Sequence, residues 1–194
     1  GKKTKKTKNL TQICLVINTV QKLLQVSPLK WNVKEQKKTK MTASENLKKL
    51  NIELPKAADP VGAYVAFKII GKLIFISGQL PIMNDGKLLK GKIGKDLSLE
   101  DGQKAAKFCA INILAQANKA VAGDLNKIKN CVKITGFVNS TDEFIDQPKV
   151  INGFSDLIVD VFGDRGLHAR SAVGMASLPR EQAVEVEMIV EVRD

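Results

Sequence analysis

The chain has 194 residues, of which 44% are hydrophobic and 26% charged, a composition typical of one globular domain with an extension. No apolar run approaches the roughly 20 residues that span a bilayer, so the sequence indicates neither a membrane-spanning helix nor a membrane partner. Three cysteines, Cys14, Cys109 and Cys131, are too widely and irregularly spaced for a disulfide framework or a zinc site. We expect Cys109 and Cys131 to be reduced core residues, and we predict no metal or other cofactor.

The net charge of +11 comes from the start of the chain. Residues 1–49 hold thirteen lysines against Glu35 and Glu45, whereas residues 50–194 hold eighteen basic and eighteen acidic residues. The neutral body therefore gives little electrostatic attraction for nucleic acid. We divide the chain into a basic N-terminal extension, residues 1–41, and a single domain, residues 42–194.

The basic extension has two interpretations. It contains no acid before Glu35, and a set of hydrophobic residues falls on one helical stripe: Ile13, Val16, Ile17, Val20 and Leu24. A basic, acid-poor and amphipathic segment is typical of an organelle-targeting leader, although such leaders are usually rich in Arg and Ser. Alternatively, the stripe packs on the body or on a partner subunit. The sequence thus predicts a cytoplasmic or organellar protein.

The domain is expected to begin with a short helix and a hairpin. Thr42 and Glu45 stand at capping-box spacing ahead of a helix that ends near Pro55. Two strand-like runs, YVAFKII and KLIFISGQL, are separated at Gly71-Lys72, which predicts a β-hairpin. A glycine-rich loop, NDGKLLKGKIGKD, then leads to the next element.

Two helices and three strands complete the predicted domain. Helical spacing of apolar residues predicts a long helix over residues 98–121 and a second over roughly 147–162, closed at Gly163. Strands are predicted at CVKITGFVN, ARSAVGMAS and AVEVEMIVEV. The order β-β-α-β-α-β-β predicts an α+β fold with both helices on one face of a mixed sheet. Because strands such as KLIFISG are apolar on both sides, we expect self-association to cover the other face.

Arg170 stands at the start of a segment that reads as a buried strand, LHARSAVGMASLP. Arginine cannot lose its charge by deprotonation, so a buried arginine needs an anionic partner. Glu185 and Glu187 share one face of the last predicted strand, and either forms a salt bridge with Arg170 if the two strands are neighbours. The alternative partner is an anionic ligand.

Other familiar catalytic patterns, including the P-loop, GxSxG, HExxH and CxxC, do not occur in the sequence. His168 is the only histidine, so neither a histidine-pair nuclease nor a multi-histidine metal site can be built within one subunit. A lone histidine at a strand entrance is more often a surface residue than a catalyst, and we expect this of His168.

Three short segments near the C-terminus, ARSAV, LP and VEVE, together resemble the signature of the RidA/YjgF family, also labelled L-PSP endoribonuclease. YVAFKIIGKLIFISGQLPI resembles the family's first hairpin, and CVKITGFVNSTDEF resembles its central strand. The similarity covers about residues 44–192, and DQPKVINGFSDLIVDVFG with GLHARSAVG resembles a longer-loop subgroup. It implies a chorismate-mutase-like (YjgF) fold and a homotrimer with pockets at subunit interfaces.

The resemblance also implies an activity, the hydrolysis of enamines and imines such as 2-aminoacrylate and 2-iminobutanoate to a 2-keto acid and ammonia. The family's carboxylate-binding arginine falls on Arg170, and its water-orienting glutamate falls on Glu185, with Glu187 left as the alternative. The matching substrate-binding positions are Tyr64, Ser77, Asn152 and Ala172. Many relatives have Cys at the place of Ala172, so a thiol-based role is excluded there.

Two other functions stay open on the sequence alone. Some members of the family were named for cleaving RNA and blocking translation, and the same pocket could serve a non-catalytic trimer that binds small molecules. RNA is the less favoured partner because the domain is neutral.

Overall fold

A computed structural model describes residues 41–193, and nearly all of the predicted extension lies outside this range. The described part begins with α2 (Ala43–Lys49), whose predicted capping box is confirmed. Thr42 N donates to Glu45 Oε2 at 2.7 Å, and Glu45 N donates to Thr42 Oγ1 at 3.2 Å. The side chain of Asn46 also donates to the carbonyl of Val161 at 2.9 Å, which ties α2 to the end of a distant helix.

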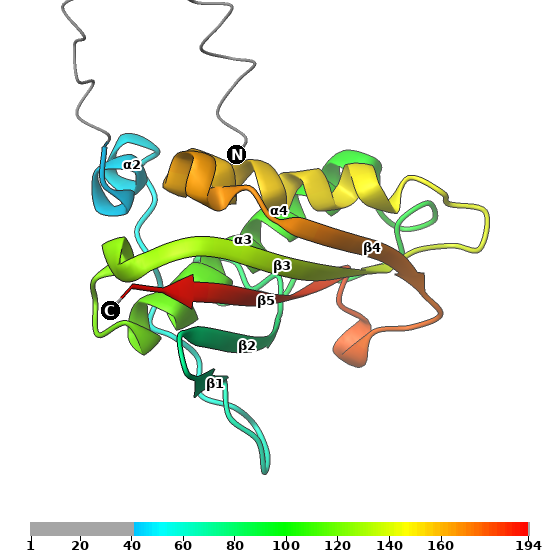
Figure 1. Cartoon of the computed structure of the whole chain (residues 1–194). Helices are drawn as coiled ribbons and strands as arrows, with labels where there is room; N and C mark the ends of the chain where they lie inside the picture. Colours follow the sequence, from blue (N-terminus) through cyan, green and yellow to red (C-terminus); the bar gives the residue numbers. More distant parts are fainter. Residues whose placement is uncertain (1–40, 194) are drawn as a thin grey trace, which may run out of the picture. The chain divides into compact units, whose positions relative to one another are not determined.

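Five strands form one mixed sheet in the order β1-β2-β5-β3-β4 (Figure 1). The strands are β1 (Phe67–Ile70), β2 (Leu73–Gln79), β3 (Ile128–Asn139), β4 (Ala169–Met175) and β5 (Val184–Val192). The β3-β4 pair is parallel, and the other neighbouring pairs are antiparallel. The predicted order of elements and the α+β class are therefore confirmed.

The predicted hairpin is also confirmed, although its first strand is shorter than predicted. Ile70 pairs with Leu73 across a two-residue turn, in which Gly71 has a φ of +57° that suits glycine. The strand begins at Phe67 instead of Tyr64. Upstream of it, single hydrogen bonds from Ser77 to the carbonyls of Ala66 and Val65 replace a regular ladder.

Two long helices, α3 (Leu99–Ala120) and α4 (Gln147–Phe162), lie side by side on one face of the sheet (Figure 1). Both lie where the sequence predicted them. A capping box of Ser98 and Asp101 starts α3, and Gly163 ends α4 with a φ of +61°. The two helices approach closely because Gly153 has no side chain, and a Cβ there would collide with the carbonyl of Gln103.

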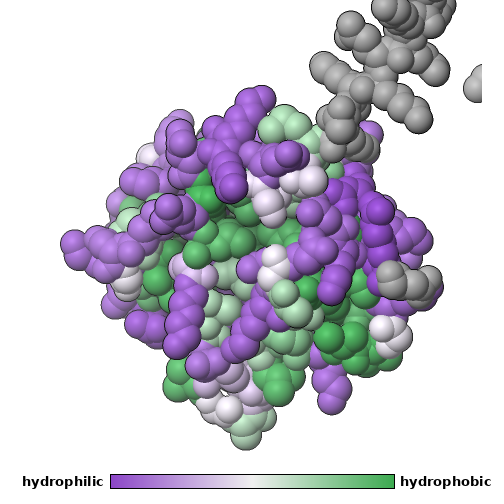
Figure 2. Space-filling model, turned by 90° about the vertical axis from the view of Figure 1, so that its left-hand side faces the viewer, coloured by the Kyte–Doolittle hydropathy of each residue, from purple (hydrophilic) through white to green (hydrophobic). Residues whose placement is uncertain are grey.

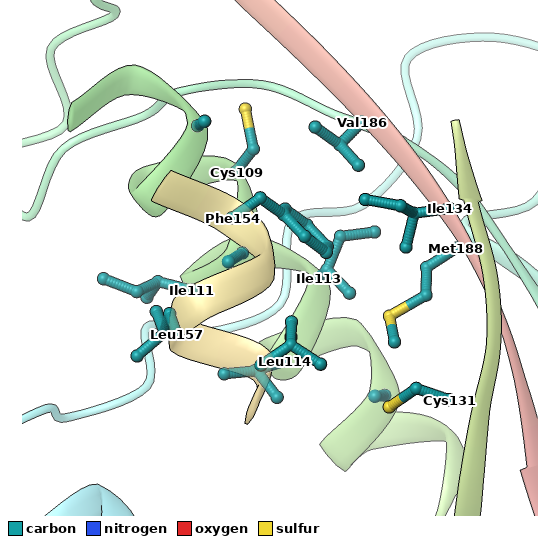
Figure 3. Packing of buried hydrophobic residues seen from close by; sticks show 14 of the residues in the cluster. Cys109, Ile111, Ile113, Leu114, Cys131, Ile134, Phe154, Leu157, Val186 and Met188 are labelled. Atoms are coloured by element: carbon teal, nitrogen blue, oxygen red, sulfur yellow. The ribbon is translucent and has the colours of Figure 1, made fainter. Parts of the chain in front are cut away.

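The core lies between these helices and the sheet, as Figure 3 shows around Phe154. Cys109 and Cys131 are free and buried within it, as predicted. Burial raises the pKa of the Cys131 thiol to about 12, so this thiol is uncharged and inert at neutral pH. Within residues 41–193 we find no helix that is both long and apolar enough to cross a bilayer.

The opposite face of the sheet, here called the open face, carries no helix of the described residues (Figure 1). On this face Phe75 of β2 pairs with Ile189 of β5, and Phe137 of β3 pairs with Val173 of β4. Phe75 is 39% exposed and Val173 42%. The prediction that strands are apolar on both sides is confirmed for β2, because Ile74 and Ile76 are buried on the helix side.

The end of the molecule near α2 is seen in Figure 2, where hydrophobic surface lies between hydrophilic side chains. Exposed hydrophobic residues at this end and along the hairpin edge include Leu50, Ile69 and Ile70. Single exposed apolar residues of this kind are normal on a protein surface. The paired apolar residues of the open face form a more continuous feature, and they flank one half of the candidate site.

Candidate active site

Arg170 lies near the start of β4, the edge strand that runs parallel to β3. It pairs with Ile134, whose buried side chain points toward the helices, so Arg170 is also on the helix side of the sheet. Its Nη1 donates to Asn152 Oδ1 at 2.8 Å and to Ser155 Oγ at 3.2 Å, both on α4. The structure thus brings together Arg170 and Asn152, two residues that the sequence assigned to the site.

The predicted salt bridge between Arg170 and Glu185 or Glu187 is wrong. It required β4 and β5 to be neighbours, but β3 lies between them. Successive strands joined by a short connection are usually adjacent, which made the prediction reasonable. Within residues 41–193 the polar partners of the Arg170 side chain are the neutral groups of Asn152 and Ser155, and its charge is not balanced by a carboxylate in an ion pair.

His168 is half-buried and hydrogen-bonded, so the expectation that it is a plain surface residue is wrong. One ring nitrogen, Nδ1, lies 2.6 Å from the carbonyl oxygen of Gly166, and the other, Nε2, lies 3.0 Å from Ser155 Oγ. Burial lowers the pKa of His168, and the nearby charge of Arg170 lowers it further, against the opposing effect of the bond to Gly166. The imidazole is therefore neutral at pH 7.

Glu185 lies at the start of β5 and belongs to the open face, because it pairs with Phe137 there. Its carboxylate is held against Gly78, where any added Cβ would collide with Oε1, and it accepts a hydrogen bond from Gln182 Nε2 at 2.6 Å. Burial raises the pKa of Glu185, the charge of Glu187 raises it further, and the bond from Gln182 opposes both. Glu187, two residues along, is exposed on the same face.

The other predicted site residues divide between these two places. Ala172 follows Arg170 on the helix side of β4 and is half-buried. Ser77 precedes Gly78 in the irregular part of β2, and its hydroxyl donates to the carbonyl of Val65 at 2.8 Å. Tyr64 lies just before the hairpin and is 58% exposed.

Two half-sites result. The arginine half-site consists of Arg170, Asn152, Ser155, His168 and Ala172, and the glutamate half-site consists of Glu185, Gln182, Gly78 and Ser77, with Tyr64 exposed upstream of the hairpin. Arg170 and Glu185 point to opposite faces of one sheet, so a single chain does not bring them together. The sequence prediction did not include Ser155, because no motif in the residues around it on α4 marks it as part of a site.

No cluster of three or more His, Cys, Asp or Glu suited to a metal ion occurs in the part of the chain that the structure describes. What the two half-sites offer instead is a cation with unused donors and a carboxylate with a raised pKa. The first suits the binding of an anion, and the second suits proton exchange with water or with a substrate.

Known proteins are similar to this chain in sequence. Protein TCP17 of Trypanosoma cruzi is 45% identical over 150 residues, which cover 77% of this chain and 93% of TCP17. A 2-iminobutanoate/2-iminopropanoate deaminase of Dermatophagoides farinae is 27% identical over 140 residues, covering 72% of this chain and 93% of the deaminase.

Solved structures agree with these relatives. Protein Atu1372 of Agrobacterium tumefaciens, described as of unknown function, aligns with a TM-score of 0.73 and 46% identity over 78% of this chain and 94% of its own. A structure titled "putative endoribonuclease" from Shewanella oneidensis aligns with a TM-score of 0.75 and 31% identity over 78% of this chain and all of its own.

The family model described as "YjgF/chorismate_mutase-like, putative endoribonuclease" matches residues 44–192, nearly the whole described domain. This range is the one over which the sequence showed its resemblance. The chain therefore belongs to the YjgF/chorismate mutase-like family.

Proposed function

We propose that this protein hydrolyses small carboxylate-bearing imines and enamines to the 2-keto acid and ammonia. The observation that carries the proposal is the state of Arg170, a permanent cation that is held, within residues 41–193, by two neutral acceptors and by no carboxylate. Both hydrogen bonds use Nη1, and no hydrogen bond within residues 41–193 uses the edge formed by Nη2 and Nε, so this edge can bind a carboxylate in the bidentate manner that arginine favours. The name of the similar deaminase of Dermatophagoides farinae supports the same substrate class.

Glu185 is the group that we assign to the water. An imine carbon is electrophilic once its nitrogen is protonated, so hydrolysis needs chiefly a well-placed water and a group to receive its proton. The water oxygen bonds to the imine carbon, and one of its protons passes to the Glu185 carboxylate. Glu185 then returns this proton to the nitrogen, the carbon–nitrogen bond of the carbinolamine breaks, and ammonia leaves. The hydroxyl proton of the resulting protonated ketone passes back to Glu185, which leaves the keto oxygen; an enamine substrate is first protonated on carbon to give the same iminium ion.

The raised pKa of Glu185 suits this exchange, because a more basic carboxylate accepts a proton from water more readily. Asn152 holds the arginine that binds the substrate, and backbone groups beside Ala172 would contact the imine. Tyr64 and Ser77 would line the glutamate half-site. These roles require the two half-sites to meet.

We infer that a second copy of the chain completes the site, because Arg170 and Glu185 lie on opposite faces of one sheet. The arginine half-site of one copy would meet the glutamate half-site of the next. The apolar open face, with Phe75 and Ile189 paired across two strands, is a surface that such an assembly would cover. A homotrimer with pockets at its interfaces is the arrangement that the family resemblance implies.

The test is the release of ammonia from 2-aminoacrylate generated in situ, with wild type compared to Arg170→Ala at equal oligomer concentration. We expect the wild type to accelerate release and the variant to lose about 100-fold or more in kcat/KM, since a bidentate charge-assisted contact is lost. Arg193→Ala, at the end of the chain after β5, is the matched control and should keep wild-type activity. Equal acceleration by Arg170→Ala would overturn the assignment.

Two further experiments distinguish the proposed function from its two alternatives. Ligand binding without turnover would identify a non-catalytic binding protein. Cleavage of RNA by a chain truncated to residues 42–194, with affinity that falls as salt rises, would identify a nuclease. The nuclease has less support, because the lone histidine of the domain is neutral at pH 7 and forms no pair with a second histidine.

A further inference from the structure

A chain of hydrogen bonds runs from the backbone to the guanidinium of Arg170. The carbonyl oxygen of Gly166 lies 2.6 Å from His168 Nδ1, His168 Nε2 lies 3.0 Å from Ser155 Oγ, and Ser155 Oγ lies 3.2 Å from Arg170 Nη1. These residues come from three elements: the 3₁₀ turn η2 (Gly163–Gly166) with the residues after it, α4, and β4. These hydrogen bonds therefore link helix α4 to the edge strand β4 at the point where the substrate carboxylate is expected.

The direction of each hydrogen bond follows from which groups can donate. A carbonyl oxygen only accepts, so the hydrogen of the neutral imidazole is on Nδ1 and Nε2 carries a lone pair. The Ser155 hydroxyl must then donate to Nε2, and its oxygen accepts from Arg170, which only donates. Donation runs one way, from Arg170 through Ser155 and His168 to Gly166.

The surroundings hold the imidazole in place. The ring of Phe154 packs edge-on against it, with centroids 6.5 Å apart and an interplanar angle of 89°. Burial keeps the ring neutral by lowering the pKa of His168. This direction of donation needs a neutral ring, because a protonated Nε2 would donate to Ser155 Oγ instead of accepting from its hydroxyl.

We infer that His168 and Ser155 are positioning residues for Arg170. They direct Nη1 toward α4 and so leave the edge of Nη2 and Nε facing the substrate carboxylate. Neither touches the reacting carbon or nitrogen. The inference rests on the proposed function for its biological meaning, because it names what orients the carboxylate-binding group of that site.

The first test needs no activity. Since His168 is the only histidine, the imidazole nitrogens of the whole protein give one set of ¹⁵N signals. We expect the Nδ1–H tautomer at pH 7, whereas a free imidazole in water prefers Nε2–H. Finding Nε2–H would overturn the inference. The relaxation of the Arg170 Nε–H signal should report an ordered side chain in wild type and a mobile one in Ser155→Ala.

The second test uses two conservative variants that separate the bonds of His168. In His168→Asn, the amide nitrogen can still donate to Gly166, but no atom reaches Ser155. In His168→Gln, the amide oxygen can take the place of Nε2 and accept from Ser155. We expect Arg170 to become mobile in His168→Asn and to stay ordered in His168→Gln.

Steady-state kinetics distinguish positioning from a merely structural role, because only positioning is expected to change KM and leave kcat nearly unchanged. Ser155→Ala and His168→Asn should raise KM for the imine, and Kd for 2-oxobutanoate, about three- to tenfold, the value of one hydrogen bond, with kcat nearly unchanged. His168→Gln should stay near wild type. Ser44→Ala, exposed on α2, is the matched control for the serine variant.

Two further outcomes would overturn the inference. A fall in kcat at constant KM, with no rescue by His168→Gln, would assign proton transfer instead of positioning. An ordered Arg170 in every variant would leave His168 and Ser155 as packing residues. If wild type hydrolyses no imine, the proposed function fails, but the tautomer and the mobility of Arg170 still decide the inference.

Discussion

The two half-sites differ in how each holds its charged group. Arg170 is exposed and stays charged, and neutral side chains of α4 hold it in orientation. Glu185 is half-buried beside Gly78, and burial raises its pKa, so its charge carries a free-energy penalty. We therefore propose that the arginine half-site presents a fixed charge and that the glutamate half-site exchanges a proton.

The sharpest test of the comparison mixes two inactive proteins. Arg170→Ala keeps an intact glutamate half-site, and Glu185→Gln keeps an intact arginine half-site. If the halves meet between copies, oligomers reassembled from an equal mixture should recover activity in about one quarter of their sites, because half of each kind of half-site is intact. Ammonia release from 2-aminoacrylate measures the recovery.

Two controls belong to the mixing experiment. Each variant reassembled alone should stay inactive, and a mixture of wild type with Arg170→Ala should keep about half of its sites. No recovery in the mixture, with mixed oligomers detected by mass spectrometry, would show that both residues must act within one chain.

A smaller effect is expected from Gly78→Ala. The backbone at Gly78 does not require glycine, since its φ is not positive, but a Cβ there would collide with the Glu185 carboxylate. Displacement of that carboxylate should lower kcat by up to about 100-fold, since a misplacement of about 1 Å can cost that much. The same collision should lower the unfolding temperature of Gly78→Ala. In the Glu185→Ala background, where the carboxylate is absent, Gly78→Ala should no longer lower the unfolding temperature.

The smallest effect concerns stability. The folded pKa of Glu185 is raised, so the unfolded chain releases this proton at a lower pH than the folded protein does. Stability from this group is present at low pH and is lost as pH rises from 4.5 through the folded pKa. Glu185→Gln should therefore unfold at a slightly higher temperature than wild type at pH 7, and the gain should vanish near pH 4.

Calorimetry at both pH values measures this difference. Glu143→Gln, an exposed carboxylate in the loop before α4, is the control and should leave the unfolding temperature unchanged at either pH. A Glu185→Gln protein less stable than wild type at pH 7 would mean that the bond from Gln182 outweighs burial.

Local sequence patterns predicted most of the helices and strands, because caps, turns and hydrophobic periodicity depend on residues that are close together in the sequence. The capping box of Thr42 and Glu45 and the stop at Gly163 are set by backbone groups a few residues away. Hydrophobic periodicity placed α3 and α4 and the burial of Cys109. The start of β1 was less predictable, since the regular ladder gives way before Phe67 to hydrogen bonds from Ser77 on the next strand.

For the site, the sequence by itself determined which residues match the family, namely Arg170, Glu185 and their companions. Its prediction that Arg170 is buried and so needs an anionic partner is wrong, because the side chain is exposed and is held by neutral groups. Only the tertiary structure decided which groups Arg170 can meet. The place of β3 between β4 and β5 removed the predicted salt bridge, and the register of both strands with β3 put Arg170 and Glu185 on opposite faces. The bond between Ser155 and His168, thirteen residues apart, also depends on how α4 packs against β4. Strand order and helix packing are set by long-range burial, which no local pattern in the sequence records.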